Sequence, residues 1–175
     1  MKKISTVFIG ADHCGFKLKG KIIKFLQTKK LLVIDAGTFS KESCDYPLIA
    51  FKIGKNVVSS KNSRGILICK TGIGDSIAAN KVKGVRAALC YNTKAARLSR
   101  EHNDSNVLVL GSDFVKEKDA KKIINIWLET EFEGGRHLRR VKQIEKFEGR
   151  IPACRQTGAD AIKKQKLRFM GAIAT

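Results

Sequence analysis

The sequence predicts an α/β protein, a three-layer α/β/α sandwich with a five-stranded parallel sheet. Short apolar segments alternate with amphipathic segments along the chain, which is the order expected of strands joined by right-handed crossover helices. The apolar segments are continuous and not alternating, as in strands that are covered on both faces. The chain of 175 residues is long enough for one such domain with a core.

The first predicted strand is residues 5–10 (STVFIG), which are rich in β-branched residues and end in glycine. Residues 16–30 follow as a predicted amphipathic helix. Leu18, Ile22 and Leu26 share one helical stripe, with Phe25 beside them and lysines elsewhere.

Residues 31–37 (LLVIDAG) are the second predicted strand. A polar loop then leads to Pro47, which suits the first turn of a helix, and residues 48–60 are the predicted helix. Residues 65–69 (GILIC) are wholly apolar and predict a third strand, buried on both faces.

The second half repeats this alternation, with a short helix at 75–81, a strand at 85–90, a helix at 92–102 and a strand at 106–111. Residues 117–130 then predict a strongly amphipathic helix. Its apolar positions are Ala120, Ile123, Ile124, Trp127 and Leu128. The completed pattern is Rossmann-like, with ligands expected beyond the carboxyl ends of the strands.

The composition changes near residue 150. We predict one domain over residues 1–150 and a basic C-terminal extension over residues 151–175, which contains KKQKLR. A frayed tail is favoured over a short helix or an ordered arm.

The chain has a formal net charge of +19. This charge favours anionic partners such as phosphorylated metabolites or nucleic acid, and solvated lysines are the alternative explanation. No apolar stretch approaches the roughly 20 residues of a membrane span. The five cysteines include no CxxC pair, which predicts a reducing, cytoplasmic location without disulfides or a zinc site.

Cys69 ends an apolar strand and faces a glycine-containing turn, KTGIGD. Backbone amides, a helix dipole and Lys70 all favour a thiolate there, which would serve as a nucleophile or a base. The alternative is a buried cysteine that acts as a small apolar residue. Thr71, Gly72 and Gly74 offer a hydroxyl and backbone amides to an oxyanion or phosphate, or simply form a tight turn.

Two further polar segments, GADHCG and EHND, contain Asp12, His13 and His102. We expect these segments to meet the Cys69 turn at one edge of the sheet. A histidine in a loop or at a helix end is able to titrate near neutral pH. Helix capping and turn formation are the alternative roles. Arg136 and Arg140 are four residues apart and therefore share one helical face. This face would bind a phosphate, or it is simply a solvent-exposed basic surface.

Together these segments resemble the type B ribose-5-phosphate isomerase family, which also includes galactose-6-phosphate and allose-6-phosphate isomerases. The resemblance covers residues 3–148 and is carried by several segments in order. They are GADHCGFKLK, DAGTFS, CDYP, GILICKTGIGDSIAANKVKGVRAA, ARLSREHNDSNVLVLGS and EFEGGRHLRRV.

The resemblance implies an aldose–ketose isomerase of the pentose phosphate pathway that uses no metal or organic cofactor. It implies a homodimer with active sites shared between subunits, or a tetramer. Cys69 would be the base that moves a proton between C1 and C2, with Thr71 and the amides of the following turn, including those of Lys70, Gly72 and Gly74, holding the enediolate oxygen.

The remaining roles follow from the same resemblance. His102 would assist opening of the sugar ring, with Asp12 on the ring hydroxyls. Tyr46 and Asn103 would line the sugar site. The phosphate would be held by His13, Arg136 and Arg140.

Three positions depart from the family pattern. Lys70 replaces a usual glycine. Asp75 replaces a usual apolar residue, and the open roles for its carboxylate are to cap the helix, to repel an anion or to pair with Lys70. Asp113 replaces a common phosphate-binding arginine, which predicts a weaker phosphate site.

Two other functions stay open from the sequence alone. A six-carbon sugar phosphate is the alternative substrate. A nucleic-acid-binding protein is the alternative class, although no recognition motif or aromatic platform supports it.

Overall fold

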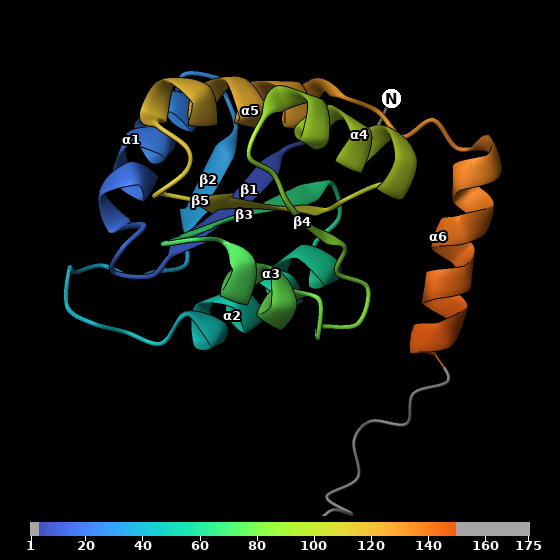
Figure 1. The fold of residues 1–175 in the computed structure, drawn as a ribbon, viewed down its shortest axis with the longest axis horizontal. Helices are drawn as coiled ribbons and strands as arrows, with labels where there is room; N and C mark the ends of the chain where they lie inside the picture. The colour runs from blue at the N-terminus through green and yellow to red at the C-terminus, as the bar shows by residue number, and fades with distance from the viewer. Residues whose placement is uncertain (1–3, 150–175) are drawn as a thin grey trace, which may run out of the picture. The chain divides into compact units, whose positions relative to one another are not determined.

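Residues 4–149 are described by the computed structural model, and they contain a five-stranded parallel sheet with helices on both faces (Figure 1). The strands are β1 (Thr6–Ala11), β2 (Leu32–Asp35), β3 (Ser63–Cys69), β4 (Ala87–Leu89) and β5 (Val107–Gly111). The helices are α1 (Phe16–Gln27), α2 (Tyr46–Ser59), α3 (Ile73–Ala79), α4 (Thr93–Asn103), α5 (Glu117–Glu129) and α6 (Gly135–Glu148).

The strand order is β2-β1-β3-β5-β4, and all neighbouring strands are parallel. Helices α1, α4 and α5 cover one face of the sheet, and α2 and α3 cover the other (Figure 1). This confirms the predicted α/β/α sandwich. The inner strands β1, β3 and β5 are almost wholly buried, whereas the edge strands β2 and β4 are only partly covered.

Each face of the sheet has its own apolar core. The core on the α1, α4 and α5 side includes the predicted stripe of α5, where Ile123, Ile124 and Trp127 are buried. Trp127 satisfies its indole N–H by donating to Ser105 Oγ at 2.8 Å. Each such buried side chain contributes roughly 1.5–3 kcal/mol of burial free energy, so the helices are held firmly against the sheet.

Strand register places the ends of three strands side by side. Ala11 pairs with Ile68, and Cys69 pairs with Gly111, so β1, β3 and β5 all leave the sheet at its carboxyl edge. Helix α4 runs back across the sheet, and its last residue, Asn103, precedes the start of β5 at the opposite, amino edge.

The chain divides into two units, residues 1–142 and residues 143–175. In the second unit the structure describes only residues 143–149, which complete α6 and its last turn. The predicted basic extension, residues 151–175, lies outside the described residues. Within residues 4–149, each helix is too short or too polar to cross a bilayer.

Candidate active site

Cys69 is the last residue of β3 and its side chain is 5% exposed. The Sγ atom accepts the backbone N–H of Gly72 at 3.1 Å. Gly72 has a φ of +84°, and a Cβ there would lie 2.4 Å from Leu89 Cδ1. A residue without a side chain is therefore required to turn this amide back toward the thiol.

Asp75 lies on the first turn of α3 and is 1% exposed. Its carboxyl group lies close enough to the Cys69 thiol for the two groups to shift each other's pKa. The expected ion pair with Lys70 is absent from the structure, because Lys70 is exposed while Asp75 points inward. The expected role of Asp75 as a partner of Lys70 is therefore wrong.

Burial and nearby charges shift the pKa values of both Cys69 and Asp75. Burial, followed by the negative charge of Asp75, raises the pKa of Cys69 to about 12, although the amides of Gly72 and Asp75 oppose this shift. Burial raises the pKa of Asp75 to about 7, against the opposing effect of the nearby Cys69 thiol. The expected preference for a thiolate is thus outweighed, and the thiol is protonated at neutral pH.

Asp12 and His13 follow β1 at the same edge. Asp12 is 6% exposed and accepts the backbone N–H of Gly15 at 2.9 Å, so it orders the turn into α1. Its charge also acts on both Cys69 and Asp75, so the capping role and a site role coexist. His13 Nδ1 accepts the backbone N–H of Cys44 at 3.3 Å.

The turn after Cys69 also contacts α2 and β4. A Cβ on Gly74 would lie 2.5 Å from the Tyr46 ring, so the glycine lets this ring pack on the turn. Thr71 Oγ1 accepts the backbone N–H of Ile73 at 3.3 Å. The Thr71 carbonyl accepts the Tyr91 hydroxyl at 3.2 Å. These contacts fix the turn on which the predicted anion-binding groups lie.

His102 and Asn103 end α4 at the amino edge. His102 stacks on His137 of α6 with ring centroids 4.1 Å apart and planes 5° apart. The Arg136 side chain donates from Nε to His137 Nε2 at 3.3 Å. Burial, His102 and Arg136 lower the pKa of His137.

The predicted site residues therefore form two clusters. The carboxyl-edge cluster comprises Asp12, His13, Tyr46, Cys69, Lys70, Thr71, Gly72 and Gly74. The amino-edge cluster comprises His102, Asn103, Arg136 and Arg140.

The two clusters are separated by the length of β5. Five residues of parallel strand span roughly 15 Å, and Cys69 lies beside the end of β5 while His102 precedes its start. The expectation that EHND meets the Cys69 turn on one rim is wrong for a single chain, because α4 carries its C-terminal end away from that rim.

Several residues at the site were not predicted from the sequence. Tyr91 and Phe114 follow β4 and β5 at the carboxyl edge, and their rings pack edge to face at 5.3 Å. The rule that ligands lie beyond strand ends would have found both.

Lys19 is 1% exposed and binds Asp35 at 2.6 Å and the Thr38 carbonyl at 2.7 Å, although its sequence context resembles that of a surface lysine.

Two groups of side chains have ligand atoms close enough for a metal ion. Asp12, His13 and Cys14 form one group, and His102, Glu133 and His137 form the other, each within 4.8 Å. In both groups the hydrogen bonds of Asp12, His13 and His137 already engage ligand atoms. Neither group therefore offers the three or four available ligands of a typical zinc site.

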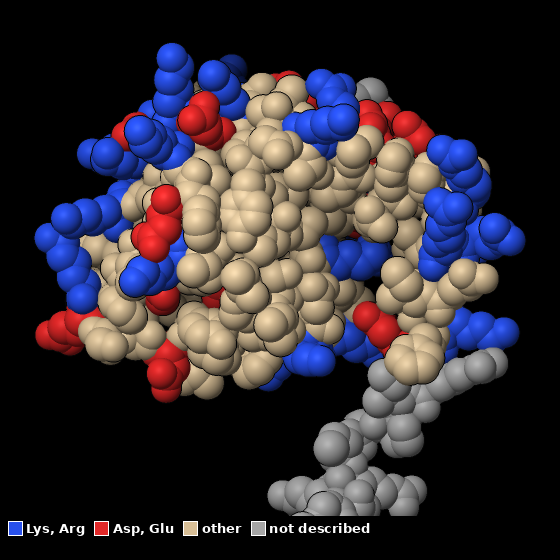
Figure 2. Space-filling model, viewed as in Figure 1, with Lys and Arg blue, Asp and Glu red and all other residues tan. Residues whose placement is uncertain are grey.

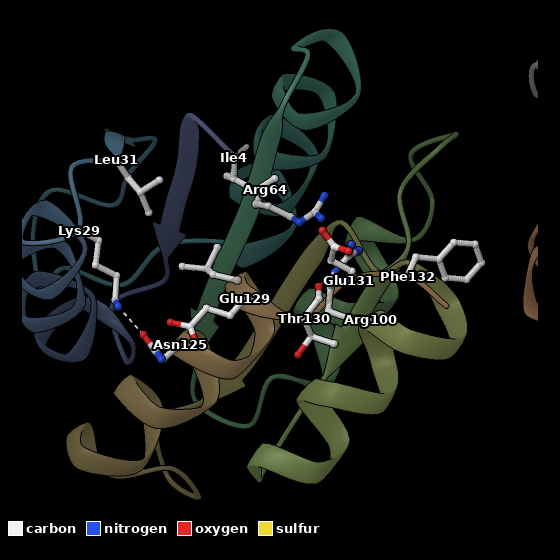
Figure 3. Close-up of a pocket in the computed structure, with 11 residues that line it drawn as sticks. Ile4, Lys29, Leu31, Arg64, Arg100, Asn125, Glu129, Thr130, Glu131 and Phe132 are labelled. Carbon is white, nitrogen blue, oxygen red and sulfur yellow. Dashed lines mark hydrogen bonds between the residues drawn. The ribbon is translucent and has the colours of Figure 1, made fainter. Parts of the chain in front are cut away.

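A cavity of about 1030 Å³ lies elsewhere (Figure 3). Arg64 reaches from β3 toward the residues that follow α5 (Figure 3). Burial and the charge of Arg100 lower the pKa of Arg64 to about 10. The cavity is lined by Ile4, Lys29, Leu31, Arg64, Arg100, Asn125, Leu128, Glu129, Thr130, Glu131 and Phe132. None of these residues belongs to either cluster, so the cavity is not the predicted site.

The fold and the carboxyl-edge cluster define an α/β enzyme with a thiol and carboxylates at the end of a parallel sheet. The profile of the ribose/galactose isomerase family matches residues 7–144. The chain belongs to this family, and it is an isomerase.

Individual relatives agree with this assignment. Ribose-5-phosphate isomerase B of Escherichia coli is 47% identical over 150 residues, which cover 86% of this chain and 99% of that protein. The Clostridium thermocellum ribose-5-phosphate isomerase B structure has a TM-score of 0.82 at 48% identity, covering 84% and 99% of the two chains. The Mycoplasma genitalium enzyme, solved with bound ribulose-5-phosphate, has a TM-score of 0.81 at 43% identity, covering 85% and 99%.

Proposed function

We propose that the protein interconverts ribose 5-phosphate and ribulose 5-phosphate in the non-oxidative pentose phosphate pathway, in the cytoplasm. The observation that carries this proposal is the buried Cys69 thiol, which faces a tight glycine turn at the carboxyl edge of the sheet. The relative with bound ribulose-5-phosphate supports the choice of sugar.

In this mechanism Cys69 moves a proton between C1 and C2 of the open-chain sugar. Proton removal beside a carbonyl leaves negative charge on an enediolate oxygen, which requires preorganised donors. The Thr71 hydroxyl and the backbone amides of residues 70–74 are the proposed donors. Asp12, fixed by its bond to Gly15, would bind the ring hydroxyls, and Tyr46 would line the sugar.

Ring opening and phosphate binding need the amino-edge cluster. His102 would assist opening of the ring, Asn103 would line the sugar, and Arg136 and Arg140 would hold the phosphate together with His13. Because β5 separates this cluster from Cys69 in one chain, we propose that a second copy supplies it. The active form would then be a homodimer with two shared sites, or a tetramer.

The surface beside the carboxyl-edge cluster supports a partner copy. Ile73, Ile77, Tyr91 and Phe114 are 53%, 59%, 42% and 61% exposed. In Figure 2 uncharged residues occupy the middle of the face where Figure 1 places α3 and β4, and Lys and Arg lie mainly toward its margins. Large exposed apolar patches next to a polar rim are typical of protein interfaces.

The test is turnover of ribose 5-phosphate by the full chain and by Cys69→Ala and Cys69→Ser. Loss of a general base lowers kcat by about 10²–10⁴-fold, so both variants should lose at least a hundredfold while substrate binding persists. Cys90→Ala is the matched control, because Cys90 is also a buried thiol but packs in the core away from the turn. Turnover of Cys69→Ala at the wild-type rate would refute the proposal, and turnover of only allose or galactose 6-phosphate would replace the substrate.

A further inference from the structure

Asp75 is a carboxyl group in an unusual setting. It is 1% exposed, and its Oδ2 atom lacks a hydrogen-bond partner among residues 4–149. A buried carboxyl group without full pairing is costly. The helix it lies on packs mainly through small apolar residues such as Ala78 and Ala79, so an apolar side chain would stabilise this position better than aspartate does.

The contacts of Asp75 are directed at Cys69. The Asp75 carboxyl group lies close enough to the Cys69 thiol for the two groups to shift each other's pKa, and the sulfur accepts the backbone N–H of Gly72 at 3.1 Å. Asp12 is the other charged group that acts on both members of the pair. From α2, the Tyr46 ring packs on Gly74 in the same turn, and Lys70 is directed to solvent.

We propose that Asp75 is a positioning residue that accepts the proton of the Cys69 thiol, so that Cys69 acts as a base through Asp75. This inference rests on the proposed isomerase function and adds a residue to it. The geometry that carries it is the buried, unpartnered Oδ2 atom of Asp75 on the helix that begins at the Cys69 turn, where the Gly72 amide donates to Cys69 Sγ.

The proton balance of the step is complete without another reagent. The thiol proton passes to the Asp75 carboxylate as the sulfur takes the proton from C2 of ribose 5-phosphate. The electron pair of the C2–H bond forms the C1–C2 double bond of the enediolate, and the negative charge moves from Asp75 to O1. The O2 hydroxyl proton then passes to O1, which places the charge on O2. The sulfur returns a proton to C1 as the C2 carbonyl forms, and Asp75 returns its proton to the sulfur.

The acidities of the two groups are consistent with this order. The pKa of Cys69 is raised to about 12 and that of Asp75 to about 7. A thiol with such a pKa is ionised in only about one molecule in 10⁵ at pH 7, whereas about half of the Asp75 groups are ionised there. The carboxylate is thus the abundant proton acceptor of the pair.

The first experiment measures kcat/KM for ribose 5-phosphate against pH in wild type and Asp75→Asn. The wild-type profile should rise through a limb near pH 7, where Asp75 ionises. In Asp75→Asn this limb should move to alkaline pH, and kcat at pH 7.5 should fall by about 10²-fold with KM changed only a few fold. Asp119→Asn on α5 is the matched control, since its side chain is 58% exposed.

If the Cys69 thiolate acts as the base without Asp75, the opposite effect of Asp75→Asn on turnover is expected. Removing the Asp75 charge lowers the thiol pKa, so more thiolate forms and Asp75→Asn would be as fast as wild type or faster at pH 7.5. That result, with wild-type turnover intact, would overturn the role of Asp75 and leave the isomerase function standing.

The second experiment needs no turnover. Iodoacetamide modification of Cys69, followed by mass analysis of its peptide across pH, reports the thiolate directly. In Asp75→Asn the midpoint should fall by at least one pH unit, while the exposed Cys14 keeps its profile. Identical Cys69 profiles in the two proteins would overturn the pairing. A wild-type protein that fails to turn over ribose 5-phosphate would refute the proposed function, and the Cys69 profiles would still decide the pairing.

Discussion

Asp75 makes the free energy of unfolding depend on pH, because its carboxyl group loses its water shell on folding. Folding raises its pKa from an ordinary 3.8 to about 7, so between these values the folded chain binds a proton that the unfolded chain has released. The contribution is fully present below pH 4, is lost as pH rises toward 7, and is constant above that range.

We therefore expect Asp75→Asn to be more stable than wild type in alkaline solution. Three pKa units correspond to about 4 kcal/mol, which is an upper bound, so a gain of about 1–4 kcal/mol is expected at pH 8. The gain should shrink toward pH 4, because the wild-type carboxyl is then protonated. Urea unfolding at pH 4.5, 6 and 8 measures it, and a wild type that is the more stable protein at pH 8 would contradict the buried charge.

The end of helix α4 depends on one carboxylate. Asp104 has a φ of +46° at the helix C-cap, and its oxygens pair with Arg86 at 2.8 Å and with Arg100 at 2.7 Å. Arg100 is 3% exposed and also donates to the Ser105 carbonyl at 2.6 Å. Asp104 thus ends α4, directs the chain into β5 and neutralises the buried positive charge of Arg100.

Asp104→Asn should remove the negative charge of residue 104 while keeping its backbone conformation. Asparagine tolerates the left-handed conformation, so the helix still ends there, but the guanidinium groups lose their carboxylate. Removing one partner of a buried pair costs 3–5 kcal/mol, and because the Asp104 side chain is 32% exposed we expect about 1–3 kcal/mol. Urea unfolding measures this loss. The loss should be absent from Asp119→Asn, and equal stability of the two variants would show that the pairing contributes little.

The strands and helices were predictable because their apolar patterns are local. All five strands and the helices through α5 lie where the pattern placed them, with ends that differ by a few residues. β4 is shorter than predicted because it lies at the sheet edge. α3 begins two residues before its predicted start, after Gly72 adopts its left-handed conformation.

The site was predictable only where the strand-end rule applies. That rule placed Cys69 and Asp12 together, as the register of β1 and β3 shows. The direction of α4 decides where His102 lies, and the spacing of polar residues carries no information on direction. The burial of Asp75 could not be predicted from the sequence, because a helix of seven residues is too short to define an apolar face.

At the level of the whole molecule, the two clusters are complementary halves on one chain. In the proposed mechanism the carboxyl-edge cluster would supply the base, and the amino-edge cluster would supply a histidine and two arginines. A chain with a net charge of +19 also repels its copies, so association requires an uncharged contact area. The exposed apolar side chains of α3 and of the segments after β4 and β5 provide such an area.

This arrangement predicts that two inactive variants restore each other. Cys69→Ala keeps a working amino-edge cluster, and His102→Ala keeps a working carboxyl-edge cluster. In a shared-site dimer, random association makes half of the dimers mixed, and each mixed dimer has one intact site and one site that lacks both groups. Co-expression should therefore give about a quarter of the wild-type turnover, although each variant alone is nearly inactive.

Differently tagged chains purified in two steps isolate the mixed dimer, which should show about half of the wild-type turnover per dimer. The double variant Cys69→Ala/His102→Ala mixed with wild type is the control, because a mixed dimer of these two chains has no intact shared site. If each chain completed its own site, this second mixture would keep about half of the wild-type activity per mixed dimer and the first would keep none. The two pairings thus give opposite results for shared and for self-contained sites, and the separation of Cys69 from His102 by the length of β5 favours the shared arrangement.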